Sequence, residues 1–196
     1  MLTRLALAAV TLAAIAAPVS AQTWKIDGAH STARFTVRHM MVSNVHGSFG
    51  KVEGTIVYDG KNIGGVKADA VVDTTTITTN NEKRDAHLKS PDFFDVAANP
   101  TITFKSKRAE AAGAGKFKLI GDLTMRGVTK EVVLDVDGPT DPVTVQNSQR
   151  IGATATTTLN RKDYGVNWSR AMDGGGVVVG DEVKVTLELE LIKQAS

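Results

Sequence analysis

The most constraining feature of the sequence is the alternation of polar and apolar side chains along most of its length. A repeat of two places successive side chains on opposite faces, as in a β-strand, whereas an amphipathic helix repeats every 3.6 residues or so. Near the C-terminus the apolar positions are Val183, Val185, Leu187, Leu189 and Leu191. The pattern predicts eight strands, over residues 32–39, 54–58, 66–72, 101–105, 116–125, 131–137, 150–159 and 183–191.

Turn-forming residues separate these segments, for example DGKNIGG at 59–65 and DGPTDP at 137–142. Short turns favour antiparallel pairing, and a sheet with one apolar face can bury that face by closing on itself. The predicted fold class is therefore all-β, an antiparallel β-barrel of about eight strands.

Several inward positions of this barrel carry small side chains, namely Ala33, Val37, Ala68, Ala70, Ala153 and Ala155. A barrel of about eight strands is either filled by its own side chains or holds one small ligand, so small inward residues favour a cavity. The alternative is a fully packed sandwich, in which small residues allow strands to cross closely. Alternation alone does not decide between the two.

One segment lacks the alternation and is predicted to be a short helical connection near residues 80–98. Asn80 or Asn81 can cap a helix that has Glu82 in its first turn, and Ser90 followed by Pro91 is typical of the start of another turn. We expect this connection to pack over one end of the sheet.

The N-terminus has the three parts of a secretory signal peptide, which we place at residues 1–21. Arg4 is its only charge, an apolar stretch covers residues 5–17, and small residues precede a cleavage site after Ala21. Residues 22–196 then form one domain, and we expect a periplasmic location. Because the chain has no cysteine, thiol chemistry and disulfides are excluded.

Charge and motifs exclude several function classes. A net charge of +2 gives no general attraction to nucleic acid. Motifs for a nucleophile elbow, a two-histidine metalloprotease site or a phosphate-binding glycine loop are absent. A metal site from His30, His39 and His46 is disfavoured because His30 and His39 are too far apart along one strand, and His46 is placed in the turn before Gly47.

Four motifs occur in order over almost the whole chain. They are WKIDGAHSTARFTVRHMMVSNVHGSF from Trp24, TTTITTNNEKRDAHLKSPDFFDVAANPTITFKS from Thr74, GDLTMRGVTKEVVLDV from Gly121 and LNRKDYGVNW from Leu159. Together they resemble the YceI-like family of exported polyisoprenoid-binding proteins. The most specific element of the resemblance is the segment 82–94, EKRDAHLKSPDFF.

The resemblance implies an extended lipocalin-like barrel whose apolar pore holds a polyprenyl diphosphate, a quinone, a fatty acyl amide or a similar lipid. It implies a carrier and not an enzyme, with no metal and no cofactor apart from the bound isoprenoid or quinone-like lipid. The predicted ligand-binding residues are Phe35, Val37, Arg38, His39, Phe49, Arg84, His87, Phe93, Phe94, Phe104, Leu123, Met125 and Trp168.

The polar head group of such a lipid is expected at the barrel mouth, near Arg38, His39, Arg84 and His87. The alternative for Arg84 is an ion pair with Asp85 or Asp92 that only anchors the connection. The expected partners are the lipid and, transiently, a membrane or membrane protein, with no nucleic acid and with the protein as a monomer or homodimer. The competing function is a structural or stress-response periplasmic barrel without bound lipid.

Overall fold

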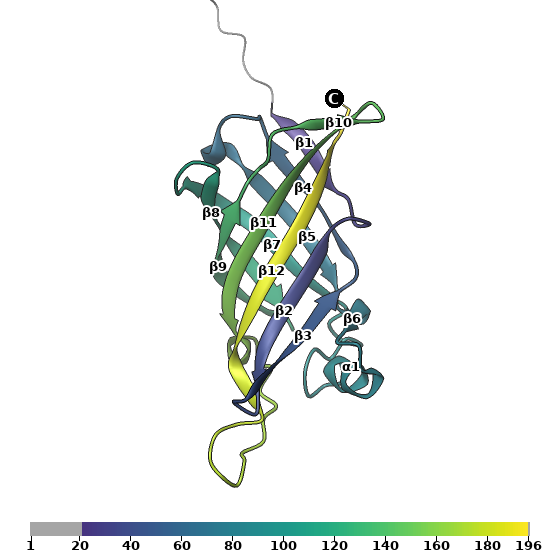
Figure 1. Ribbon diagram of the computed structural model, residues 1–196, viewed down its shortest axis with the longest axis vertical. Helices are drawn as coiled ribbons and strands as arrows, with labels where there is room; N and C mark the ends of the chain where they lie inside the picture. Colours follow the sequence, from purple (N-terminus) through teal and green to yellow (C-terminus); the bar gives the residue numbers. More distant parts are fainter. Residues whose placement is uncertain (1–20, 196) are drawn as a thin grey trace, which may run out of the picture.

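The computed structural model describes residues 21–195, which form one antiparallel sheet curled into a long barrel (Figure 1). The signal peptide prediction falls almost entirely on residues 1–20, outside the described range. The strands are β1 (Gln22–Ile26), β2 (Thr32–His39), β3 (Ser43–Phe49), β4 (Val52–Tyr58), β5 (Lys67–Asp73), β6 (Ile77–Thr78), β7 (Thr101–Ala111), β8 (Lys116–Met125), β9 (Val128–Asp137), β10 (Val143–Val145), β11 (Ser148–Asn160) and β12 (Val179–Lys193). The helices are η1 (Ile63–Gly65), η2 (Thr74–Thr76), α1 (Glu82–Lys89) and η3 (Arg161–Tyr164).

Eight strands close the barrel, in the order β1, β4, β5, β7, β8, β9, β11, β12 and back to β1. All of these pairings are antiparallel, so the all-β barrel prediction is confirmed. The remaining strands extend the sheet beyond the ring, with β10 on β11 and with β2, β3 and β6 continuing from β12.

Strand β12 determines this arrangement because its two edges are used differently. One edge pairs with β11 from Glu182 to Ile192. The other edge pairs with β2 along its first part and with β1 at its end, where Leu191 lies opposite Ile26. The ring is therefore closed beside the start of β1 and the end of β12, while β2 and β3 continue the sheet along β12 toward the opposite end (Figure 1).

Four strands were not predicted from the sequence: β1, β3, β6 and β10. Strand β3 contains Gly47 and few apolar residues, which hides its alternation. The placement of His46 in a turn is wrong, because His46 lies within β3 and its Nδ1 is 3.0 Å from Thr36 Oγ1 on the neighbouring strand.

The predicted helical connection is confirmed as α1 and the turns that follow it. Asn81 caps the helix, since its side-chain oxygen accepts a hydrogen bond of 3.0 Å from the backbone N–H of Arg84. Figure 1 shows α1 beside β6, at the end of the barrel opposite the termini. No helix among the described residues is long and apolar enough to cross a bilayer.

A charged cluster stabilises the closed end. Arg150 Nη1 donates to Asp27 Oδ2 at 2.8 Å and also contacts Glu190 Oε1. Hydrogen bonds from His30 and then Arg150 lower the pKa of Asp27 from 3.8 to about 2. Asp27, His30 and Glu190 have ligand atoms within 4.8 Å of one another, but the Arg150 guanidinium supplies the positive charge that a metal would bring. His39 lies at the far end of β2 from this cluster.

Candidate functional site

The barrel encloses an apolar cavity of about 610 Å³. The cavity runs from Ile26 and Leu191 near the closed end to His39 and Trp168 at the other, and the strands of the ring contribute lining residues along it. This volume lies within the usual range for small-molecule sites, roughly 300–1,000 Å³. The alternative of a fully packed interior is therefore wrong.

Small side chains create this space. Ala33, Ala68, Ala70, Ala153 and Ala155 all line the cavity, as the alternation pattern predicts. They lie on β2, β5 and β11, three strands that contribute to different walls of the barrel. Larger residues at these positions would meet across the interior and fill it.

Aromatic rings form the cavity wall nearest α1. The centroids of Phe35 and Phe49 are 5.8 Å apart, and Phe49 meets Phe94 edge-to-face at 5.6 Å. Phe94 follows α1 in the chain, so its contact with Phe49 links the segment after α1 to the barrel interior. These contacts bury apolar surface and hold α1 against the opening that β2 and β3 leave.

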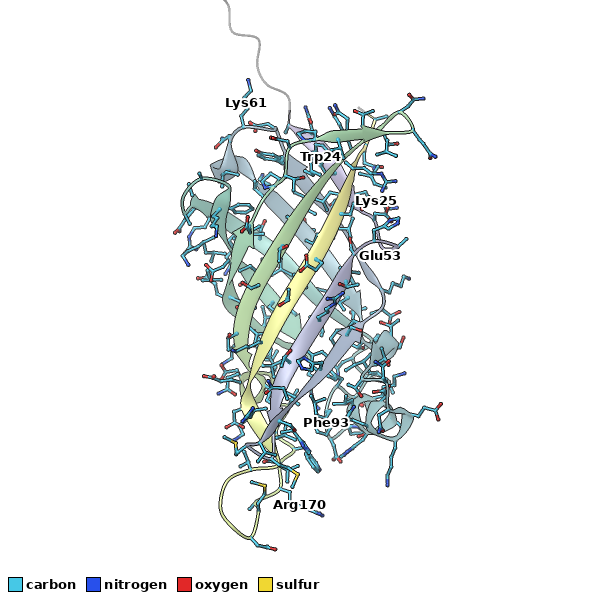
Figure 2. The ribbon with its side chains drawn as sticks, in the orientation of Figure 1. Trp24, Lys25, Glu53, Lys61, Phe93 and Arg170 are labelled. Carbon is cyan, nitrogen blue, oxygen red and sulfur yellow. The ribbon has the colours of Figure 1, made fainter. Side chains whose placement is uncertain are left out.

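A second aromatic cluster lies at the mouth of the cavity. His87, Phe93 and Trp168 pack with ring centroids between 4.9 and 5.3 Å apart. His87 Nε2 is 2.8 Å from Asp92 Oδ2, and Arg126 donates to the carbonyl of Pro91 at 3.0 Å. Figure 2 shows Phe93 at the end of the barrel opposite Trp24. The cluster of His87, Phe93 and Trp168 covers the mouth, and these contacts connect it to both α1 and the barrel.

Thr79 anchors α1 through two charged residues. The Thr79 hydroxyl donates to Asp85 Oδ1 at 2.5 Å and accepts a hydrogen bond from Arg84 Nε at 2.7 Å. Burial raises the pKa of Asp85, but hydrogen bonds from Thr79 and Thr78 outweigh it, so that pKa is lowered overall. The proposed ion pair of Arg84 with Asp85 or Asp92 is not formed, because the Arg84 guanidinium bonds to the side chain and carbonyl of Thr79.

The charged groups around the cavity are all basic. Among the described lining residues there is no Asp or Glu, whereas the basic ones are Arg34, Arg38, His39, Lys83, Arg84, His87 and Arg161. A lining that contains basic but no acidic side chains favours anionic ligands.

The basic side chains differ in whether they already form hydrogen bonds or ion pairs within the protein. Arg38 is exposed at the edge of the cavity and donates to the Met41 carbonyl at 2.8 Å. Arg84 is held by Thr79, as described above. His39 and Lys83 make no side-chain hydrogen bond or ion pair within residues 21–195, so their donors are available to a ligand head group.

Sequence reasoning missed Lys83 and Arg161. Lys83 is exposed on α1 and lines the cavity, and only the fold shows that α1 lies over the mouth. Arg161 is buried and donates to the carbonyls of Val166 at 2.6 Å and Trp168 at 2.8 Å, so it fixes the segment that carries Trp168. The LNRKDYGVNW motif contains both ends of this interaction.

The structure brings the predicted ligand-binding residues together around one cavity. Its lining includes Phe35, Val37, Arg38, His39, Phe49, Arg84, His87, Phe93, Phe94, Phe104, Leu123, Met125 and Trp168. Their contact with a ligand stays a prediction. Ser31, which follows His30, is not among the described lining residues, and its hydroxyl bonds to the backbone of Glu190.

An antiparallel barrel that encloses an apolar cavity with a basic mouth places the protein in the lipocalin-like structural class. The family model described as YceI-like domain matches residues 24–191, so the chain belongs to the YceI-like family.

Comparisons with individual proteins agree with this assignment. A UPF0312 protein of Staphylococcus aureus is 38% identical over 165 residues, covering 84% of this chain and 94% of the relative. The Campylobacter jejuni YceI structure has a TM-score of 0.69 at 26% identity and covers 81% of this chain and 90% of its own. Burkholderia cenocepacia BcnA, with a TM-score of 0.71 at 21% identity, covers 84% and 98% and shows the fold alone.

The substitution Thr79→Val tests whether Thr79 anchors the cover of the mouth. It removes the hydroxyl that bridges Asp85 and Arg84, and a hydrogen bond to a charged group contributes about 1.5–3 kcal/mol. We expect the free energy of unfolding in urea to fall by that amount.

Thr129→Val is the matched control, because Thr129 is exposed and its hydroxyl bonds only to that of Thr124 among the described residues. We expect a change within about 0.5 kcal/mol for this variant. Equal losses of unfolding free energy for the two variants would contradict the anchoring role of Thr79.

Proposed function

We propose that the protein is a non-catalytic periplasmic carrier that holds a long isoprenoid or a similar amphiphilic lipid in its barrel. The continuous apolar cavity with basic groups gathered at its mouth is the observation that carries this proposal. A Saccharophagus degradans structure described as a polyisoprenoid binding domain shares the fold, with a TM-score of 0.65 at 16% identity and coverage of 87% of this chain and 98% of its own. The predicted signal peptide supports the location.

Burial of hydrocarbon supplies the binding energy in this account. Each methylene removed from water is worth about 0.8 kcal/mol, so a five-carbon isoprene unit contributes about 4 kcal/mol. Several units would exceed the observed ceiling for non-covalent affinity, about 20 kcal/mol, and the sum is therefore not the net affinity. Because a bilayer is about as apolar as the cavity, transfer between them is nearly balanced, which suits a carrier.

The mouth favours an anionic head group over a neutral one. A diphosphate buried without partners would cost several kcal/mol, so it belongs where donors are present. His39 and Lys83 offer free donors, with Arg38, Arg84 and His87 close to the same opening. A quinone or a fatty acyl amide would use only one or two of these groups and would leave the remaining positive charge unmatched.

Ser31, Asp85 and His39 are the candidate catalytic side chains, and each has surroundings that fit a non-catalytic role. Ser31 bonds to the backbone of Glu190, and Asp85 bonds to Thr79 and Thr78. His39 has neither a nucleophile nor an orienting carboxylate within hydrogen-bond distance in the described chain, which a nucleophile and base pair requires. The lipid is therefore expected to leave the protein chemically unchanged.

Ala155→Phe tests the cavity as the ligand site. The phenyl ring points inward from β11 into space that a lipid tail would occupy, so we expect affinity for a prenol or prenyl diphosphate to fall by about tenfold or more. Because the ring enters a cavity, the melting temperature should change little. Binding is measured by the change in Trp168 fluorescence and by retention of lipid on gel filtration.

The control is Thr156→Phe, which places the same ring on the exposed face of the same strand. This variant should bind the lipid as the unchanged protein does. Undiminished binding to Ala155→Phe would show that the ligand lies elsewhere.

Lys83→Gln tests the charge of the head group. It removes a cation at the mouth that forms no ion pair within the described residues. Affinity for a prenyl diphosphate should therefore fall several-fold, whereas affinity for the uncharged prenol of the same length should stay unchanged. Isothermal titration calorimetry with the two ligands measures both values.

Glu82→Gln is the control, since Glu82 is exposed on the same helical turn and does not line the cavity. An equal loss for both ligands in Lys83→Gln, or a loss for neither, would remove Lys83 from the head-group site.

A further inference from the structure

The turn between β2 and β3 exposes three consecutive large apolar side chains. Met40, Met41 and Val42 are 45%, 53% and 77% exposed, respectively. Single exposed apolar residues are ordinary on protein surfaces, but a contiguous exposed patch marks an interaction site. None of the three lines the cavity, so the cavity does not account for them.

The backbone conformation of this turn disfavours methionine, so the two methionines indicate a role other than forming the turn. Met40 and Met41 have φ angles of 49° and 59°, in the left-handed region. Hairpin turns of this kind favour Asn and Gly, and other residues are held there at a cost in stability. The turn therefore presents large apolar side chains to solvent where local preference favours small or polar ones.

A second segment brings another methionine to the same place. The loop between η3 and β12 pairs with the turn, since Met40 N donates to the Val178 carbonyl at 2.8 Å. A Cβ at Gly176 would lie 3.2 Å from Met172 Cε and 3.5 Å from Met41 Cγ, so both methionines lie beside this glycine. We call Met40, Met41, Val42 and Met172 the apolar tip.

Three basic residues lie at the same end of the barrel as the apolar tip. Arg38 precedes it in β2, Lys83 lies on α1 at the same end of the barrel, and Arg170 is in the loop that carries Met172. None of the three forms an ion pair with an acidic side chain within residues 21–195. Figure 2 shows Arg170 beyond the last strands, on the loop that projects furthest from the barrel. Of the acidic residues at this end, Asp85 bonds to Thr79 and Asp181 pairs with Lys162 and Arg161. Glu82, Asp173 and Glu182 are exposed.

The apolar tip also lies at the end of the barrel where the cavity opens. His39 directly precedes it and lines the cavity, and Trp168 lies in the same loop as Met172. A lipid that enters through this mouth would pass beside the apolar tip. At the closed end, the exposed Val143 and Val145 lie on β10, away from the opening of the cavity.

We infer that the apolar tip docks on the surface of a bilayer that contains anionic phospholipid. A few apolar side chains on a projecting turn, with cations at the same end of the barrel, match the interfacial region of a membrane, where apolar groups enter the head-group layer and cations bind anionic lipids. A protein partner would need a flatter surface of roughly 800 Å². The inference builds on the proposed function, because it names the membrane surface as the source or destination of the carried lipid.

The double substitution Met40→Asn with Met41→Gly separates docking from folding. Asn and Gly suit the left-handed backbone, so the melting temperature should be unchanged or higher. In flotation with isoprenoid-free phosphatidylcholine vesicles that contain phosphatidylglycerol, the partition coefficient of the variant should be at least about tenfold lower than that of the unchanged protein. Prenol binding from solution should be unchanged, because neither methionine lines the cavity.

Two further variants complete the test. Val143→Thr with Val145→Thr removes exposed apolar side chains from β10, outside the apolar tip, and should leave flotation unchanged. Arg170→Gln should weaken binding to the anionic vesicles and leave the weaker binding to pure phosphatidylcholine vesicles as it is.

The inference fails if the unchanged protein does not float with anionic vesicles at low salt, or if the Met40→Asn, Met41→Gly variant floats equally well. A concentration-dependent dimer that the double variant abolishes, without vesicle binding, would instead assign the apolar tip to a second copy of the chain. Failure of the carrier function would appear separately, as loss of prenol binding from solution.

Discussion

The antiparallel pairing of β12 with three other strands is the interaction on which the barrel depends. Its edge toward β11 is paired almost throughout, while the opposite edge is divided between β2 and β1. The division closes the ring at one end and leaves the other end wider, to be covered by α1 and the aromatic cluster of His87, Phe93 and Trp168. One long strand thus determines where the cavity is closed and where it opens.

A cavity of this size is unusual, because protein interiors are densely packed. Side chains that face empty space lose dispersion contacts, so a cavity of this size lowers stability unless something fills it. A lipid tail would restore those contacts without directed hydrogen bonds. The polar head group of an amphiphile would then lie at the mouth, where His39 and Lys83 form no side-chain hydrogen bond or ion pair within residues 21–195. The ion pairs of Arg150 stabilise the opposite end.

The sequence predicts the ring better than its surroundings. Period-two alternation found β8 with its observed bounds and found β12 as a shorter segment, because the inward and outward residues of these long strands differ clearly in polarity. It missed β1 and β3, which are short or contain glycine. The positions that line the cavity followed from alternation and family resemblance together. Lys83 did not, since only the placement of α1 over the mouth gives that side chain a role.

Native mass spectrometry of the protein, purified without detergent from periplasmic extract and followed by lipid extraction, tests the carrier account most directly. We expect one lipid per chain, with an isoprenoid or similar long tail and an acidic head group, recovered chemically intact. A mass equal to that of the polypeptide alone, with no lipid in the extract, would contradict the account.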